Sequence, residues 1–323
     1  MTIMKFESKV FYYAMIFLLL TSSYLVEAQG LEPVIRFEGI KTWETTNSPS
    51  NPGYEHIPNW LKLPTTISEI VPSGITIDSK GNIYILDRGD SIPSIICVNN
   101  EGELLFQRKI KEFGGSHFIY CDKDDNFWVS DTKNHQIYKL NSSFKIVFTM
   151  GEMGVSGDDK THFNKPTDVE FLTDGSCLIS DGYGNHRIMK LNSDFKYQEE
   201  WGVEGTKPGE FVLPHCLTLG SDGRVYVADR DAWRVQIFNQ QGKLLEVWPH
   251  IGRIFDLAET PDKHFVCLDG TTPRITEVNE QGKVIGFFGE GDLLKGAHGL
   301  VVTPDGSIIV ALTTGRVEKF SKK

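Results

Sequence analysis

The chain has 323 residues, and 33 Lys and Arg against 43 Asp and Glu give it a formal net charge of −10. Apolar residues make up 40% of it and charged residues 24%, which is typical of a folded globular protein and excludes a disordered or fibrous one. No run of Lys and Arg is longer than two residues, so the sequence argues against a nucleic-acid partner, because phosphate binding needs basic patches.

Residues 1–28 have the layout of a secretory signal peptide. Lys5 and Lys9 precede an apolar stretch at 10–20, and the sequence Val-Glu-Ala at 26–28 provides a small-x-small cleavage site. We therefore expect a mature chain of residues 29–323 that forms a single domain, is secreted or periplasmic, and is not transmembrane once the signal is removed. The alternative is an uncleaved membrane anchor, although the apolar stretch is short for a span, which needs about 20 residues.

The remaining sequence repeats one pattern about six times. Each copy reads as strand, tight turn and strand, as in PSGITIDSKGNIYILD (72–87) and PHCLTLGSDGRVYVAD (214–229), and two more strand-like runs follow. One apolar position recurs 40 to 50 residues apart, at Ile75, Ile119, Val169, Leu217, Leu257 and Leu300. Four antiparallel strands in about 45 residues are typical of a propeller blade, so the sequence predicts an all-β, six-bladed β-propeller.

The ends of the chain suggest how the ring closes. The sixth repeat stops three strands in, at GRVEKF (315–320), and EPVIRFEG (32–39) resembles the fourth strand of repeat five, KVIGFFG (283–289). We expect this N-terminal strand to complete the last blade and lock the ring, because closure removes two free sheet edges.

Five cysteines lie in apolar, strand-like runs, and no C-x-x-C motif is present. They are Cys97, Cys121, Cys177, Cys216 and Cys267. We expect free thiols that pack as small apolar side chains, and no thiolate metal site.

Histidine occupies one repeat position in three alternate repeats. Two residues before the shared apolar position, the repeats carry in order Ser73, His117, Thr167, His215, Phe255 and His298. Alternate blades of a six-fold ring lie about 120° apart, so His117, His215 and His298 should converge on the axis at one mouth of the central channel. Three neutral imidazoles with an open fourth position suit catalytic zinc, although copper or iron could use the same ligands. The alternative is three unrelated structural histidines, as we expect for His135 and His186 outside this column.

Other polar residues follow the second strand of a repeat, nearer the predicted mouth. Arg88 and Arg230 could clamp a substrate carboxylate, and the phenol of Tyr183 beside a dication could serve as a base. The alternative for the arginines is an ion pair with a nearby acid, such as Asp90 or Asp231. The aspartate that ends the second strand recurs as Asp87, Asp131, Asp181, Asp229 and Asp269, which predicts a structural role in holding the loop.

At these residues the sequence resembles the peptidyl-α-hydroxyglycine α-amidating lyases, whose propeller is built from NHL-type repeats. The matching segments, spread over residues 72–320, include LDRGD (86–90), KPTDV (165–169), SDGYGNHRI (180–188), GEFVLPHCL (209–217), YVADRDAWRVQIF (226–238) and AHGLVVTPDG (297–306). The resemblance implies zinc on His117, His215 and His298. It also implies that Tyr183 is the base and that Arg88 and Arg230 bind the substrate. The implied reaction splits a peptide or N-acyl α-hydroxyglycine into an amide and glyoxylate.

The sequence departs from the family at its calcium site. The family's calcium uses two backbone carbonyls, which match Ile75 and Ile119, and an Asp directly after the third zinc histidine, where this chain has Gly299. Calcium favours carboxylate oxygens, so we expect it to be weakly held or absent.

Two further departures concern disulfides and a partner domain. Asn164 with Gly184, and Tyr226 with Ile237, stand where the family has paired cysteines. No copper monooxygenase domain precedes the repeats in this sequence, so a separate monooxygenase would have to supply the hydroxylated substrate. Two alternative functions stay open. One is a non-catalytic exported propeller that binds a protein or glycan, and the other is a hydrolase or lyase that uses a three-histidine zinc site on another small substrate.

Overall fold

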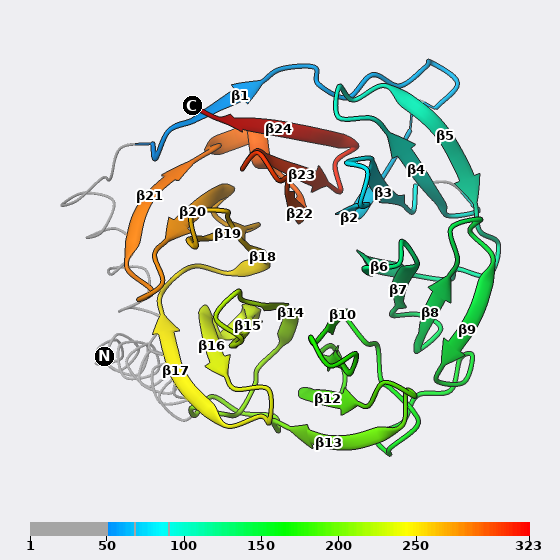
Figure 1. Cartoon of the computed structure of the whole chain (residues 1–323), viewed down its shortest axis with the longest axis vertical. Coiled ribbons are helices and arrows are strands. Elements are labelled where there is room, and N and C mark those ends of the chain that lie inside the picture. The colour runs from blue at the N-terminus through cyan, green and yellow to red at the C-terminus, as the bar shows by residue number, and fades with distance from the viewer. Residues whose placement is uncertain (1–50, 68, 90) are drawn as a thin grey trace, which may run out of the picture.

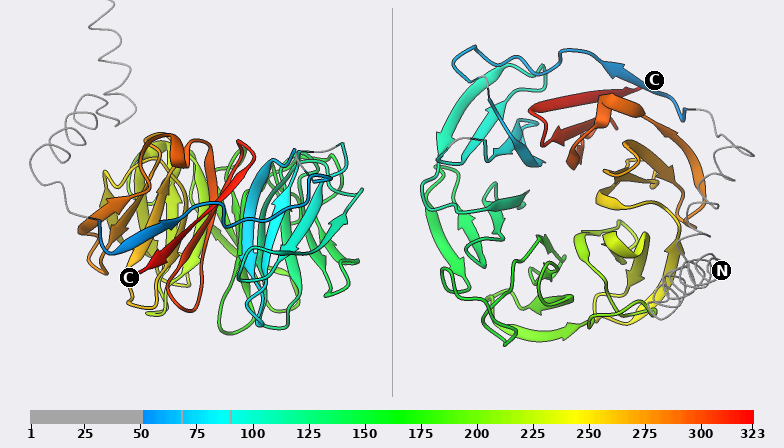
Figure 2. Two further views of the ribbon diagram at one scale, coloured as in Figure 1. Left: turned by 90° about the horizontal axis from the view of Figure 1, so that it is seen from above. Right: turned by 180° about the vertical axis from the view of Figure 1, so that it is seen from behind.

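Six four-stranded antiparallel sheets form a ring in which each sheet is one blade (Figures 1 and 2). The computed structural model describes residues 51–323 apart from 68 and 90. Blade one contains β2 (Pro72–Ile77), β3 (Ile83–Asp87), β4 (Ser94–Val98) and β5 (Leu104–Lys109). Blade two contains β6 (Ser116–Cys121), β7 (Phe127–Asp131), β8 (Gln136–Leu140) and β9 (Ile146–Met150). Blade three contains β10 (Asp168–Phe171), β11 (Cys177–Asp181), β12 (Arg187–Leu191) and β13 (Tyr197–Trp201).

The remaining blades follow the same order from the axis outward. Blade four contains β14 (Pro214–Leu219), β15 (Val225–Asp229), β16 (Arg234–Phe238) and β17 (Leu244–Pro249). Blade five contains β18 (Ile254–Glu259), β19 (Phe265–Asp269), β20 (Arg274–Val278) and β21 (Val284–Phe288). Blade six contains β22 (Ala297–Val302), β23 (Ile308–Leu312), β24 (Arg316–Lys322) and β1 (Tyr54–Ile57). The predicted six-bladed, all-β propeller is confirmed.

The repeated sequence pattern produces the repeated blade. The turn between the first two strands needs one residue with positive φ, and the six blades place there Gly81, Asp125, Gly175, Gly223, Lys263 and Gly306. The second strand of every blade is buried along its whole length because its sheet is covered on both faces. A strand covered on both faces reads as a continuous apolar run instead of an alternating one.

The ring closes through an N-terminal strand, but not through the segment that the sequence suggested. β1 pairs antiparallel with β24, with Tyr54 opposite Lys322 and Ile57 opposite Lys319. The Tyr54 ring stacks on Phe288 of blade five, with 4.3 Å between ring centroids. The assignment of the closing strand to 32–39 was therefore wrong, because β1 occupies that edge of blade six. Both 32–39 and the predicted signal peptide lie outside the described residues.

Helical structure in the described part of the chain is limited to two short 3-10 turns, η1 (Arg230–Ala232) and η2 (Gly291–Leu294). Across residues 51–323, with 68 and 90 left aside, no helix has the length and apolar character to cross a bilayer. All five cysteines are free thiols, as predicted, and only Cys121 is less than fully buried.

Candidate metal centre

A β-bulge at the start of the innermost strand aims the histidine column toward the axis. In blade four, Pro214 pairs with Asp229 and Cys216 with Ala228, so His215 is the extra residue. The same shift occurs around His298, and in blade two it falls between Ser116 and Ile119. A bulge of this kind bends the strand and redirects a side chain, here toward the centre of the ring.

His117, His215 and His298 meet at the axis, as the alternate-blade pattern predicts. One potential ligand atom from each lies within 4.8 Å of the others. Their ring centroids are 4.7, 4.8 and 5.2 Å apart, and the three residues are 2%, 0% and 6% exposed. Three residues separated by about a hundred positions in the sequence are thus brought to one buried point.

The other three members of the column orient these imidazoles. His117 Nδ1 donates to the Thr167 carbonyl at 2.9 Å, and His215 Nδ1 donates to the Phe255 carbonyl at 2.6 Å. His298 Nδ1 completes the set with a 2.7 Å bond to the Ser73 carbonyl. Because a carbonyl can only accept, each Nδ1 carries the proton and each Nε2 keeps a lone pair. Backbone support of this type is common behind metal-binding histidines. The sequence carries no signal for this role of the column's non-histidine members, because any residue type can supply a backbone carbonyl.

The three imidazoles are held neutral. Burial lowers the pKa of His117 and His215 well below the ordinary value and that of His298 to about 3. The positive charges of Arg88 and Arg230 lower the pKa of His117 and His298 further. Three neutral Nε2 acceptors facing one buried point are the donor set that zinc prefers, so the residues present fit a metal ion.

Tyr183 lies in the loop between β11 and β12 of blade three, and its hydroxyl reaches the point where the histidines converge. Its hydroxyl lies 3.2 Å from Nε2 of His117 and 3.1 Å from Nε2 of His215. Gly182 lets the loop come this close, because a Cβ at that position would lie 1.9 Å from the carbonyl oxygen of Pro214. The phenol therefore stands beside the place where the three imidazoles converge.

Arg230 is held rigidly against Tyr183. Its Nη1 donates to the Tyr183 hydroxyl at 3.1 Å, while Nε and Nη2 donate to the two oxygens of Asp231 at 3.0 and 3.2 Å. Arg253 donates to the same carboxylate at 2.7 Å. Burial alone would raise the pKa of Asp231, but the hydrogen bonds from both arginines lower it. The ion pair with Asp231 that the sequence offered as an alternative is thus present together with a contact to the site.

Arg88 has a different environment from Arg230. Its side chain is partly buried, and no hydrogen bond or ion pair joins its guanidinium to another described residue. Burial lowers its pKa, while the field of nearby Tyr183 acts in the opposite direction. Asp90, the partner that the sequence offered as an alternative, lies outside the described residues. A partly desolvated cation without a carboxylate partner in the described part of the chain is well suited to receive an anion.

The aromatic side chain of Phe118, which no sequence pattern marks as part of the site, borders the three histidines. The Phe118 ring lies 4.8 Å from His117, 5.5 Å from His215 and 5.3 Å from His298, measured between centroids. Because these histidines surround the axis, a ring that contacts all three must lie close to the axis. Phe118 is 5% exposed, so it forms an apolar boundary of the site.

The recurring aspartates have the predicted structural role. Asp131 accepts hydrogen bonds from the backbone N–H groups of Gly114, Gly115, Lys133 and Asn134. Asp87, Asp181, Asp229 and Asp269 bind backbone N–H groups of neighbouring loops in the same way. His186 also has a structural contact, since its Nδ1 bonds the carbonyl of Val212.

The structure shows the surroundings of Gly299 and of the two residue pairs that stand where the family has disulfides. A Cβ at Gly299 would lie 2.9 Å from the carbonyl oxygen of Ser73, so an Asp could not replace this glycine without a shift of the backbone. Weak or absent calcium binding at this position stays a prediction. A Cβ at Gly184 would lie 2.2 Å from the Asn164 side chain, and Tyr226 pairs with Ile237 across two strands. Both pairs are adjacent, as the family's disulfides would require.

Comparisons with known proteins agree with this fold. A family model for the NHL repeat matches residues 211–238. The virginiamycin B lyase of Staphylococcus aureus superimposes with a TM-score of 0.59, covering 84% of this chain and 100% of that one at 14% sequence identity. The class of protein is therefore a six-bladed propeller of NHL-type repeats with three convergent histidines.

Sequence comparison identifies the relatives of this chain more narrowly. A probable peptidyl-α-hydroxyglycine α-amidating lyase of Caenorhabditis elegans is 29% identical over 281 residues, which cover 74% of this chain and 79% of the relative. A peptidyl-glycine α-amidating monooxygenase of Xenopus laevis is 28% identical over 77% of this chain, which matches only 34% of that longer protein. The chain is thus a homologue of peptidyl-α-hydroxyglycine α-amidating lyases, as the resemblance in its sequence predicted.

Proposed function

We propose that this protein is a zinc-dependent lyase that cleaves peptidyl-α-hydroxyglycine, or a similar N-acyl α-hydroxyglycine, to an amide and glyoxylate. The observation that supports this most strongly is the meeting of three neutral imidazoles with the Tyr183 hydroxyl at one buried point. The lyase relative in Caenorhabditis elegans supports the same reaction class.

His117, His215 and His298 would hold the metal through Nε2. Zinc bound there would supply a Lewis acid that makes the α-hydroxyl of the substrate more acidic. Tyr183 would take the hydroxyl proton, and Nη1 of Arg230, which donates to the Tyr183 oxygen at 3.1 Å, would hold that oxygen in place. Arg88, whose guanidinium has no partner among the described residues, would bind the terminal carboxylate.

The reaction balances without a further reactant. When Tyr183 removes the hydroxyl proton, the oxygen's electron pair forms the carbonyl of glyoxylate. The C–N bond breaks at the same carbon, and its electron pair passes to the amide nitrogen. That nitrogen then takes up one proton, so one proton is moved and none is consumed overall.

The proposed reaction requires a substrate that another enzyme has hydroxylated at glycine. The longer Xenopus relative is named a monooxygenase. We propose that this protein is exported by its N-terminal signal and receives its substrate from a separate monooxygenase. Sequencing the N-terminus of secreted protein tests the export: a first residue near 29 is expected, and a start at Met1 would contradict it.

Incubation with N-benzoyl-α-hydroxyglycine tests the proposed reaction, with a protein-free sample as the blank. Equal amounts of benzamide and glyoxylate are expected, and His298→Ala should lose the activity because it removes a metal ligand. Formation of benzoate would instead indicate a hydrolase. No product above the blank, from protein that contains zinc, would indicate a non-catalytic propeller.

A further inference from the structure

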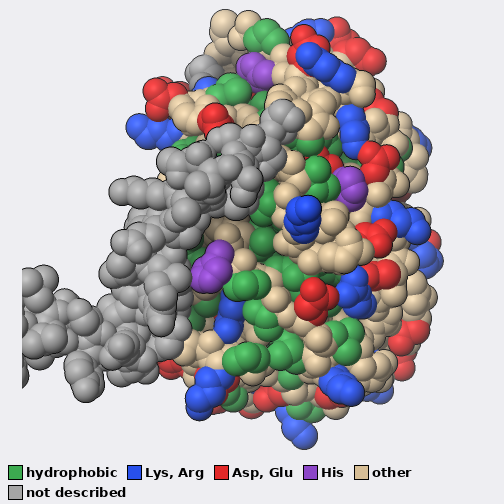
Figure 3. Space-filling view, turned by 90° about the vertical axis from the view of Figure 1, so that its left-hand side faces the viewer, with side chains coloured by type: hydrophobic (Ala, Val, Ile, Leu, Met, Phe, Trp, Pro, Cys, Tyr) green, Lys and Arg blue, Asp and Glu red, His purple; other side chains and the backbone are tan. Residues whose placement is uncertain are grey.

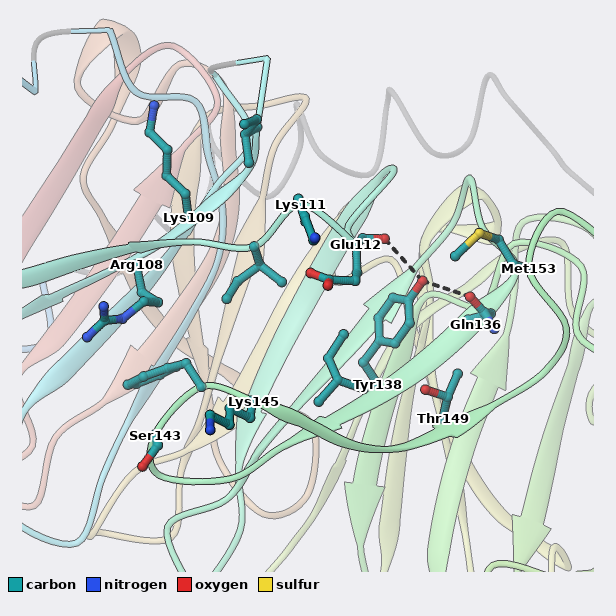
Figure 4. Close-up of a pocket in the computed structure, with 14 residues that line it drawn as sticks. Arg108, Lys109, Lys111, Glu112, Gln136, Tyr138, Ser143, Lys145, Thr149 and Met153 are labelled. Carbon is teal, nitrogen blue, oxygen red and sulfur yellow. Dashed lines mark hydrogen bonds between the residues drawn. The ribbon is translucent and has the colours of Figure 1, made fainter.

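A basic groove runs along the outer wall between blades one and two, away from the histidines. Its volume is about 870 Å³, and its walls include the end of β5, the linker that follows it, and the outer strand β9 (Figure 4). His117 lies on the innermost strand of blade two and β9 is the outermost, three strand spacings away. At about 4.8 Å per spacing, β9 lies roughly 14 Å from the strand that carries His117.

The charge of this groove is opposite to that of the protein. Arg108, Lys109, Lys111 and Lys145 line it and are all exposed, and Glu112 is the only acidic side chain among the described residues that line it. Arg108, Lys111 and Lys145 form no ion pair within the described part of the chain. The whole chain has a net charge of −10. Arg108, Lys111 and Lys145 therefore give one groove of an acidic protein a local site for an anionic partner.

Other parts of the outer wall do not share this character. The outer strand of blade three, β13, has the sequence YQEEW, and that of blade four, β17, is LLEVWP, so both carry acidic side chains. Figure 3 shows the side of the ring that includes β17 and β21, where basic and acidic side chains are interspersed. The excess of positive charge is thus a property of the groove and not of the ring as a whole.

The groove also offers what an extended polypeptide would bind. β9 is the last strand of its sheet and pairs only with β8, so the backbone groups on its outer edge have no strand partner among the described residues. Ile92 and Met153, which are 39% and 60% exposed, provide apolar contacts along the walls. A free strand edge favours a peptide over other polyanions, because only a polypeptide can extend the hydrogen-bond ladder.

We propose that this groove binds an extended acidic segment of a partner protein, which adds as a strand to β9 and pairs its carboxylates with Arg108, Lys111 and Lys145. Alternating residues of such a strand point to opposite faces, so every second side chain would face the groove and its basic residues. Binding here needs neither the metal nor the lyase reaction.

Fluorescence anisotropy with a labelled ten-residue peptide of alternating Glu and Leu tests the proposal. The charge-reversal variant Lys111→Glu/Lys145→Glu should weaken binding at least tenfold. The control variant Lys243→Glu/Lys283→Glu changes the net charge equally, and its two lysines occupy the same turn position in blades four and five as Lys145 does in blade two. The control should bind like the wild type, and both variants should keep the wild-type melting temperature and metal content.

A second peptide separates strand addition from simple attraction of charge. N-methylation of alternate residues keeps every carboxylate but removes the backbone donors, so it should also weaken binding at least tenfold. Equal affinity for the methylated peptide would overturn strand addition. Equal weakening by the groove variant and the control variant, or no binding of the acidic peptide to the wild type at low salt, would overturn the site itself.

Discussion

Replacement of Tyr183 by Phe isolates the hydroxyl group that contacts the candidate metal centre. The ring packs edge-on against His117 and His215, with centroids 5.3 and 5.7 Å away, and Phe preserves this packing. The change removes only the oxygen that lies 3.2 and 3.1 Å from the two Nε2 atoms and accepts from Arg230. The fold and the metal content should therefore be retained.

The expected effect on rate follows from the loss of the proposed general base. Such groups contribute about 10²–10⁴-fold, which is roughly 3–5 kcal/mol of activation free energy. Stability should fall by about 1–3 kcal/mol, because the nearly buried Arg230 loses one hydrogen-bond acceptor. These two effects have different sizes and different assays, so they can be separated.

The assay measures glyoxylate release at saturating substrate, together with melting temperature and zinc content. The control is Tyr197→Phe, which removes a hydroxyl from β13 on the outer wall and should leave kcat unchanged. If Tyr183→Phe retained the wild-type kcat with normal zinc content, the proposed role of Tyr183 as the base would be refuted.

Three further predictions concern the proposed zinc ligands, the proposed carboxylate receptor and a partly buried acid. His215→Ala should lower the zinc content of protein purified without added metal from one equivalent to well below one, and elemental analysis measures this. Arg88→Ala should raise KM for the α-hydroxyglycine substrate at least tenfold, because the carboxylate loses its charged partner; an unchanged KM in steady-state kinetics would contradict this role. Burial raises the pKa of Glu170 to about 7, against about 4.3 when unfolded, so the folded state loses stability as pH rises through this window. Glu170→Gln removes this loss, so its melting temperature relative to wild type should increase from pH 5 to pH 8 by the equivalent of about 1–3 kcal/mol. The control variant is Glu280→Gln, at an exposed position in a turn of blade five.

The architecture and the histidine column could be predicted because both depend on strict repetition. Each blade needs the same turn and the same buried second strand, so the pattern recurs in the sequence and can be counted. The position of a residue within its repeat then fixes its angle around the axis. This is why His117, His215 and His298 could be brought together from their spacing alone, without any local motif.

The closing strand was assigned to the wrong segment because its signal is weak. β1 is only four residues long, and its sequence, YEHI, has neither the length nor the alternation of a typical strand. Its stability depends on tertiary contacts, such as the stacking of Tyr54 on Phe288 and the pairing with β24. The segment 32–39 resembles a strand more closely, but local preference does not decide which segment pairs with an edge.

The inner organisation of the site depends on orientations that a linear pattern does not contain. The sequence places Arg88 and Arg230 after equivalent strands, which suggested equivalent roles. In the structure Arg230 is fixed by Asp231 and directed at Tyr183, whereas Arg88 has no partner among the described residues. The support of the imidazoles by carbonyl oxygens was similarly hidden, because any residue type can supply a backbone carbonyl.

Stepwise addition of zinc to chelator-stripped protein, with glyoxylate release measured at each step, tests most directly whether the three histidines hold a catalytic metal. The activity should be absent at the start and rise in proportion to added zinc. It should then level off at one equivalent per chain, with glyoxylate and amide formed in equal amounts. Full activity in the stripped protein, or no glyoxylate at any zinc loading, would contradict a zinc-dependent lyase at this site.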